Sequence, residues 1–102
     1  MAKDQSSITL TNNPERKRFE ASLDGYQGRV EYMLVQDRII YTHTEVDPAL
    51  EEKGVGSLLV RYALEYARQE GLKIMPLCPF VAGYMKRHTE YNDLLMPGFN
   101  LG

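Results

Sequence analysis

Two glycines two residues apart, Gly54 and Gly56, precede a segment with the residue pattern of an amphipathic helix. The first N–H groups of a helix have no partner within the helix, and the positive end of the helix dipole lies there. Glycine lets the backbone approach a ligand closely, so this arrangement favours an anion, typically a phosphate group. A helix-start glycine can also be purely structural, so the pattern alone leaves both interpretations open.

Two well-known phosphate-binding patterns do not match this loop. A Walker loop requires Gly-Lys-Ser/Thr at the helix start, whereas Gly56 is followed by Ser57-Leu58. A dinucleotide-binding fingerprint requires a third glycine where this chain has Leu59, and a tighter turn from the preceding strand. The loop therefore matches neither pattern, and a ligand role and a structural role both remain open.

Three other residues carry side chains that can take part in proton or acyl transfer. His43 and Glu45 lie two apart in a strand-like segment, which places both on one face of that strand. Histidine exchanges protons near neutral pH and can act as a general base. Cys78 is the one cysteine, so no internal disulfide can form. In the alternative interpretation, His43 is a hydrogen-bonded core residue, Glu45 is solvated and Cys78 is a small buried apolar residue.

The segments before the glycine loop have the pattern of strands. Alternating and β-branched residues predict strands at 16–23, 28–36 and 38–46. Asp24-Gly25 is a strong turn signal, and Gln36-Asp37 is compatible with a second tight turn. Short connections between sequential strands predict an antiparallel meander.

A helix and a further strand follow the loop. Apolar residues recur at helical spacing over 55–70, and the predicted buried face carries Val55, Leu59, Tyr62, Ala63, Tyr66 and Ala67. The apolar segment 72–79 predicts a fourth strand, which should run parallel to 38–46 because a crossover helix joins them. Residues 79–88 predict a short helix with Pro79 near its start. The expected fold is a mixed α/β (α+β) fold with a mostly antiparallel, twisted sheet.

Length and composition limit the function classes. We expect residues 1–102 to form one domain, with 1–14 and 97–102 loosely ordered. A net charge of −2 and a pI near 5.6 argue against nucleic acid or anionic membranes as partners. One cysteine and two histidines do not supply a structural zinc site, so no metal is expected. No apolar run suits a signal peptide or a membrane span, so the expected compartment is the cytoplasm.

Three sequence blocks occur in an informative order: HTEVDPALEEKGVGS, then IMPLCPFV, then YMKRHTEY. With the meander, the loop, the helix and the parallel strand, they resemble the GNAT superfamily of acetyl-CoA-dependent N-acetyltransferases. The resemblance covers roughly residues 16–92 and is closest to a minimal, single-domain branch of that superfamily. It implies a β-loop-α-β acetyl-CoA-binding core with a short C-terminal helix.

The resemblance also implies residues that bind the coenzyme. Backbone amides of the loop would hold the pyrophosphate, which assigns this role to Lys53, Gly54, Val55, Gly56, Ser57 and Leu58. The pantetheine arm would pair with the backbone of residues 43–47, which includes Val46. Arg87 could meet the 3′-phosphate, or it could belong to a solvated helix end. Glu51 replaces the usual Gln or Arg of the loop, which should weaken affinity.

Catalytic roles follow from the same resemblance. The attacking amine must be neutral, so His43 or Glu45 would serve as its base. Cys78 could instead accept the acetyl group with His43 as its base, although direct attack is the usual route in the family. Tyr84 could protonate the leaving thiolate, or its ring could simply pack in the core.

The expected function is acetyl transfer from acetyl-CoA to an amine that the sequence does not identify. Larger relatives have an additional helical segment between their first two strands that walls the acceptor groove, and this chain has only the turn near Asp24-Gly25. A small amine, a protein amine or a site completed by a partner chain remain open, and a monomer or weak homodimer is expected. The alternatives are a non-catalytic CoA- or acyl-CoA-binding module and an interaction domain that has lost the ligand.

Overall fold

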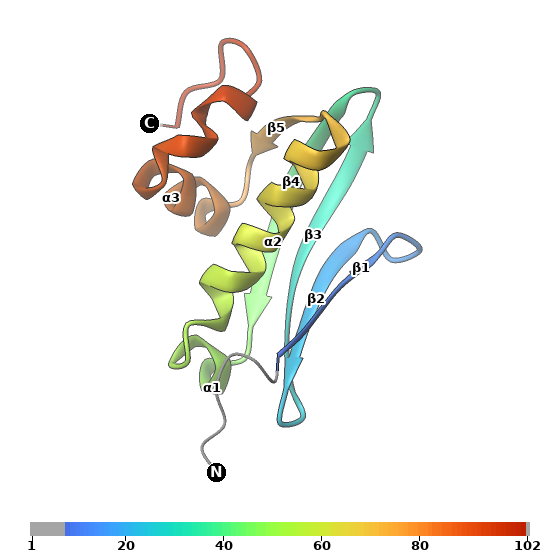
Figure 1. Ribbon diagram of the computed structural model, residues 1–102, viewed down its shortest axis with the longest axis vertical. Helices are drawn as coiled ribbons and strands as arrows, with labels where there is room; N and C mark the ends of the chain where they lie inside the picture. The colour runs from blue at the N-terminus through green and yellow to red at the C-terminus, as the bar shows by residue number, and fades with distance from the viewer. Residues whose placement is uncertain (1–7, 102) are drawn as a thin grey trace.

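The computed structural model describes residues 8–101, in which five strands form one sheet. Strands β1 (Thr9–Asn13), β2 (Arg18–Leu23), β3 (Tyr26–Val35) and β4 (Arg38–Val46) are antiparallel and lie in chain order. Strand β5 (Lys73–Pro76) pairs with β4 in parallel. The mixed, mostly antiparallel sheet and the parallel crossover pair predicted from the sequence are therefore confirmed (Figure 1).

The helices lie on one side of this sheet (Figure 1). Helix α1 (Pro48–Glu51) is a short turn of helix after β4, and α2 (Val55–Glu70) lies across the strands. Helix α3 (Pro79–Arg87) and the 3₁₀ helix η2 (Thr89–Leu94) pack beside α2 near β5. Because α2 has an apolar residue every three to four positions, its buried stripe covers the sheet and forms the core with it.

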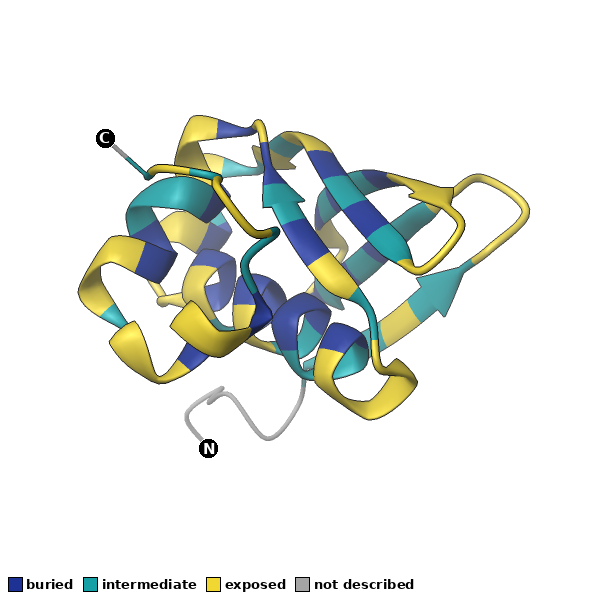
Figure 2. Cartoon of the chain, turned by 90° about the horizontal axis from the view of Figure 1, so that it is seen from above, coloured by how far each residue is buried: buried dark blue, intermediate teal, exposed yellow. Residues whose placement is uncertain are grey.

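Side chains alternate between the two faces of the sheet, so one face is covered and the other is open. In β2, the residues Phe19, Ala21 and Leu23 are buried beneath α2. Their neighbours in β2 and the matching residues of β3, β4 and β5 point to the opposite face, and none of these is buried. Figure 2 shows this alternation as bands of buried and less buried residues along the strands. Among the described residues, no helix covers the open face.

The Asp24-Gly25 turn has the geometry that its sequence predicts. Both residues have positive φ, 55° and 83°, as a type I′ hairpin turn requires. In the second turn, Gln36 also has a positive φ of 58°, although no glycine is present. Both turns join their strands in register, so the meander follows directly from local turn chemistry.

Three elements differ from the sequence-based expectation. Residues 9–13, expected to be loosely ordered, form β1, because their backbone pairs with β2 along its whole length. The remainder of the 1–14 prediction falls largely on residues 1–7, which lie outside the described part of the chain. The predicted strand 72–79 is shorter, since β5 ends at Pro76. The loop before the glycines contains α1, whose first turn is capped by Asp47.

The C-terminal segment 97–101 belongs to no helix or strand, although Leu101 packs against the core. In the described part of the chain, no helix combines the length and the apolar character needed to cross a bilayer.

Candidate active site

The start of α2 presents backbone N–H groups without partners. Gly54 precedes the helix in a left-handed conformation, with φ 75° and ψ 15°, and no side chain caps the helix. Within residues 8–101, the N–H groups of Val55, Gly56 and Ser57 donate to no other group. Leu58, by contrast, donates its N–H to the Gly54 carbonyl at 3.3 Å. Three donors and the positive end of a 16-residue helix therefore face one place, as anion binding requires.

Phe80, at the start of α3, lies against Gly56. A Cβ atom at Gly56 would stand only 2.9 Å from Cζ of Phe80. The phenyl ring is 37% exposed and, with Glu51, Gly54 and Ser57, lines a pocket of about 170 Å³ at the helix start. Gly56 therefore has a packing role in addition to its place in the loop, because any side chain there would displace the ring.

Strands β4 and β5 separate immediately after Tyr41. Their pairing ends at Tyr41 and Pro76, where the Tyr41 carbonyl accepts both the Leu77 and the Cys78 N–H, each at 3.0 Å. Beyond this point β4 continues without β5 beside it. The Asp47 N–H donates to Gln27 on β3 at 3.1 Å. Along an antiparallel strand, successive residues direct their backbone N–H and C=O groups alternately to one side and to the other. Because Asp47 bonds to β3, Thr44 and Val46 direct their backbone groups away from β3 and into the gap.

A β-bulge in β4 decides which face carries His43. In the register of β3 and β4, Glu31 pairs with His43 while Tyr32 pairs with Tyr41, so Thr42 is an extra residue. Tyr41 is buried under α2, and an uninterrupted strand would bury His43 on the same face. The extra residue shifts the alternation, and His43 and Glu45 both reach the open face. His43 is 52% exposed, which excludes the interpretation that it is a core residue.

Charged side chains surround His43 on the open face. Nε2 of His43 lies 3.8 Å from Oε2 of Glu45, while Oε1 of Glu45 pairs with Arg29 at 2.8 Å. Arg29 also donates to Glu31 at 2.7 Å, and this hydrogen bond is the main reason that its pKa is raised. Glu45 is thus held by a cation and oriented beside His43, so His43 is the better placed of the two as a base.

Cys78 lies on the other side of the sheet from His43. Its Sγ is 3.1 Å from Oγ1 of Thr44, and the side chain is only 4% exposed. Because His43 and Thr44 are adjacent in β4, their side chains point to opposite faces. The structure therefore does not bring His43 and Cys78 together as a base and a nucleophile.

Tyr84 has a buried ring on α3. The ring stacks on His88 with centroids 4.0 Å apart and an interplanar angle of 17°. Burial raises the pKa of Tyr84 above its ordinary value, so the hydroxyl is a weaker acid than a solvated tyrosine. That hydroxyl has no hydrogen-bond partner within residues 8–101, and it is not one of the buried unpaired atoms, so it reaches the surface. Both the packing role and a proton-donating role are compatible with this position.

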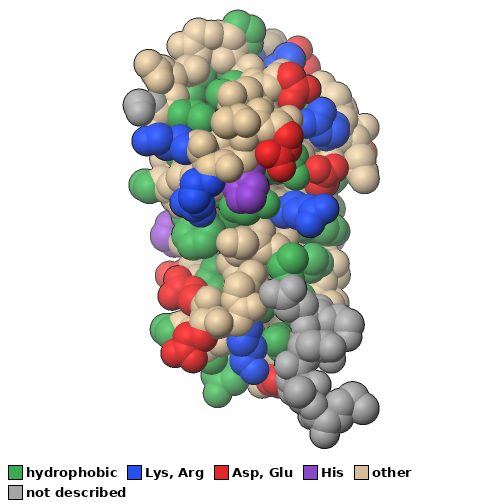
Figure 3. Space-filling model, turned by 60° about the vertical axis from the view of Figure 1, so that its left-hand side comes forward, with side chains coloured by type: hydrophobic (Ala, Val, Ile, Leu, Met, Phe, Trp, Pro, Cys, Tyr) green, Lys and Arg blue, Asp and Glu red, His purple; other side chains and the backbone are tan. Residues whose placement is uncertain are grey.

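The remaining predicted coenzyme ligands lie around the start of α2 and the end of α3. Lys53 is exposed in the turn between α1 and α2. Arg87 is exposed in the last turn of α3, one turn from Gly83, with Lys86 before it. Figure 3 shows Lys and Arg side chains on either side of a histidine on this part of the surface. In the described chain, no group of His, Cys, Asp and Glu is arranged to hold a metal ion.

Sequence reasoning missed three residues at this site. Thr44 and Arg29 gain their positions from the bulge and from pairing between strands, for which a single sequence carries no signal. Phe80 stands in the quoted IMPLCPFV block, so its position beside Cys78 could have indicated a role. Thr44 contacts Cys78 at the gap, Arg29 contacts Glu45 on the open face, and Phe80 contacts Gly56 at the helix start.

Comparison with known protein families shows to which family this chain belongs. The sequence profile of the GCN5-related N-acetyl-transferase family matches residues 18–94. The chain belongs to the GCN5-related N-acetyltransferase family. The expected family is thereby confirmed. Membership supports the expected acyltransferase activity, and the non-catalytic alternative is not favoured.

Relatives of similar length support this membership. Protein NATD1 of Mus musculus is 30% identical over 95 residues, which cover 88% of this chain and 86% of that protein. Protein NATD1 of Homo sapiens is also 30% identical over 95 residues, covering 88% and 84% of the two chains. A GCN5-like protein from Staphylococcus aureus, solved by NMR in solution, superposes with a TM-score of 0.70 at 25% identity. That superposition covers 94% of both chains, so the N-acetyltransferase fold accounts for nearly all of the protein.

Proposed function

We propose that this N-acetyltransferase binds acetyl-CoA between the start of α2 and the gap beside β4, and transfers its acetyl group to an amine on the open face. One observation supports this most strongly. Two residues near the start of α3 touch both features, because Phe80 packs on Gly56 and Cys78 contacts Thr44. The anion cradle and the unpaired edge of β4 are therefore neighbouring parts of one continuous site.

The residues at the site fit the coenzyme. The N–H groups of Val55, Gly56 and Ser57 would hold the pyrophosphate, and the cations Lys53 and Arg87 would accompany the phosphates. The coenzyme supplies the acetyl group as a thioester. The unpaired backbone N–H of Thr44 or Val46 would donate to the carbonyl oxygen as negative charge develops there.

Proton transfer is assigned to His43 and Tyr84. His43 Nε2 takes the proton from the acceptor nitrogen on the open face, and Glu45 stabilises the imidazolium that forms. The Tyr84 hydroxyl carries a proton near neutral pH and can donate it to the departing thiolate, although burial raises its pKa and makes it a weaker acid. These roles require direct attack of the amine, since Cys78 has no base beside it and is shielded by Thr44.

The proposal also includes a cellular compartment and an oligomeric state. A free, buried thiol fits a reducing compartment, so we place the activity in the cytoplasm. We propose a monomer or weak homodimer, with acetyl-CoA and an amine as its two substrates.

Thermal unfolding with and without acetyl-CoA tests the binding half of this proposal. At 100 times the dissociation constant, binding should stabilise the protein by about 2.7 kcal/mol. This corresponds to a rise in Tm of roughly 10 °C or more. Mass spectrometry of products over a panel of amines tests the transfer half. Stabilisation without transfer to any amine would support a binding module, and no stabilisation at millimolar acetyl-CoA would refute the proposal.

A further inference from the structure

The open face of the sheet gives little cover to a small acceptor. All described helices lie on the other face, and the side chains around His43 and Glu45 are half exposed. Small-molecule sites typically bury about 70–90% of their ligand in a concave pocket. A small amine beside His43 would remain largely hydrated, whereas the rest of a macromolecular acceptor would itself shield the amine from water.

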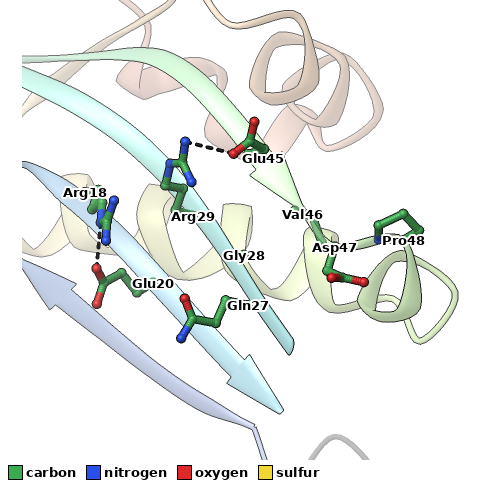
Figure 4. A pocket seen from close by; sticks show the side chains of 9 residues that line it. All are labelled: Arg18, Glu20, Gln27, Gly28, Arg29, Glu45, Val46, Asp47 and Pro48. Atoms are coloured by element: carbon green, nitrogen blue, oxygen red, sulfur yellow. Dashed lines mark hydrogen bonds and ion pairs between the residues drawn. The ribbon is translucent and has the colours of Figure 1, made fainter. Parts of the chain in front are cut away.

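Two polar hollows lie on the open face; His43 lines neither of them, but its neighbour Glu45 lines the first. One hollow of about 320 Å³ lies at the end of β4 and is bordered by Glu45, Arg29 and Arg18 (Figure 4). A second hollow of about 390 Å³ reaches β1 at Thr11 and Asn13. The two hollows share Arg18, Glu20 and Gln27, so they are adjacent, and together they are called the groove.

The strand register gives the distance across the open face from His43 to β1. His43 pairs with Glu31, Glu31 pairs with Arg18, and Arg18 pairs with Asn13, so these four residues form one row across the sheet. Three strand spacings amount to about 14 Å. An extended peptide covers that distance with about four or five residues.

Charges along the row are paired except at its far end. Arg18 donates to Glu20 at 2.6 Å, and Arg29 is bound by Glu31 and Glu45. Arg16, in the turn between β1 and β2, lines the groove and is exposed. Within residues 8–101 its guanidinium has neither an ion pair nor a hydrogen bond. Arg16 interacts electrostatically with Glu20, but the Glu20 carboxylate already accepts a hydrogen bond from Arg18. A ligand would therefore meet a cation that has no ion pair of its own within residues 8–101.

We propose that the acceptor is an extended peptide that lies across the open face, with its amine at His43 and an acidic residue at Arg16. The acidic residue stands about four or five residues from the acceptor amine. This inference rests on the proposed function and deepens it, because it names the substrate class of the same site. The neutral polar side chains of the groove, such as Gln27 and Thr11, would bond to the peptide backbone.

Acetylation of designed peptides tests this assignment. The substrates are N-terminally blocked peptides with one lysine and either Glu or Arg at the fourth and fifth positions on both sides. The wild-type protein should acetylate the Glu peptide with a kcat/KM about twofold to fivefold higher, as expected for an exposed charge pair. Arg16→Glu should reverse this preference. Arg38→Glu, a charge reversal at the opposite corner of the same face, should leave it unchanged.

The outcomes separate this inference from the function on which it rests. An unchanged Glu/Arg ratio in Arg16→Glu would overturn the peptide assignment. So would a free polyamine that is acetylated at least as efficiently as the best peptide, and in both cases the acetyltransferase function would stand. A protein that binds acetyl-CoA but acetylates neither peptides nor small amines would refute the proposed function, and this inference with it.

Discussion

The Cys78 thiol and the Thr44 hydroxyl lie 3.1 Å apart and join β4 to the segment that follows β5, just beyond the point where the two strands separate. Cys78 immediately precedes α3, and Thr44 lies on the covered face of β4. This contact occupies the thiol and leaves it 4% exposed. It therefore assigns Cys78 to the wall of the gap, where it joins the sheet to α3.

Cys78→Ala should retain most of the turnover, because the amine attacks directly and needs no acyl-cysteine. Cys78→Ser, which keeps a hydrogen bond to Thr44, serves as the control for packing. Incubation with acetyl-CoA alone, followed by intact-mass measurement, should show no stoichiometric acetylation of Cys78. Rapid acetylation at this residue, with transfer to an added amine at the turnover rate, would show that the thiol is the nucleophile.

His43→Ala should lower kcat/KM by about 100-fold, the usual contribution of a general base. Steady-state kinetics of the wild type and the variant with the same amine measure this loss. Glu45→Gln should have a smaller effect, since Arg29 already holds the Glu45 carboxylate. An unchanged kcat/KM in His43→Ala would place the base elsewhere.

Gly56→Ala should lower the Tm, because the new methyl group would stand 2.9 Å from Cζ of Phe80. Adding Phe80→Leu should restore the Tm by making room for that methyl group. Acetyl-CoA should still fail to stabilise the double variant if Gly56 also admits the phosphates to the backbone. Recovery of both properties in the double variant would mean that Gly56 serves packing alone.

Glu51→Gln should tighten acetyl-CoA binding by several-fold at most, because Glu51 lines the pocket at the start of α2. The gain should shrink as salt is added, since an exposed charge is readily screened. Glu52→Gln provides a matched control, because Glu52 is also exposed but does not line that pocket. Calorimetry at low and high ionic strength measures both, and equal affinities for the two variants would show that Glu51 points away from the coenzyme.

We expect the folded protein to lose stability at high pH because of Tyr91. Burial, together with the hydrogen bond to Glu65, raises the pKa of Tyr91 to about 12, whereas an unfolded tyrosine titrates near 10. The folded state therefore holds this proton more tightly. Its contribution is fully present below about pH 10 and is lost as the pH rises towards 12.

Urea unfolding between pH 8 and 11 measures this dependence. Tyr91→Phe should reduce the loss above about pH 10, because the variant has no hydroxyl to deprotonate. It should not abolish the loss, since burial also raises the pKa of Tyr41 well above its ordinary value. Equal losses in wild type and variant would contradict the assignment to Tyr91.

The sequence by itself determined the features that depend on neighbouring residues. Asp24-Gly25 sets a turn with two positive φ values, and the spacing of apolar residues sets α2. The glycine before α2 leaves the helix start uncapped, as its position in the sequence suggested. The three sequence blocks led to the family because they follow one another in order along the chain.

Only the tertiary structure decided which residues meet. Residues 9–13 lack a strand pattern, and they form β1 because β2 offers an unpaired edge. The bulge at Thr42 sends His43 to the open face and leaves Thr44 beside Cys78, which separates the base from the thiol. Simple alternation would have placed Tyr41 and His43 on one face. A bulge depends on the register between two strands, so it is a property of their pairing and not of either segment alone.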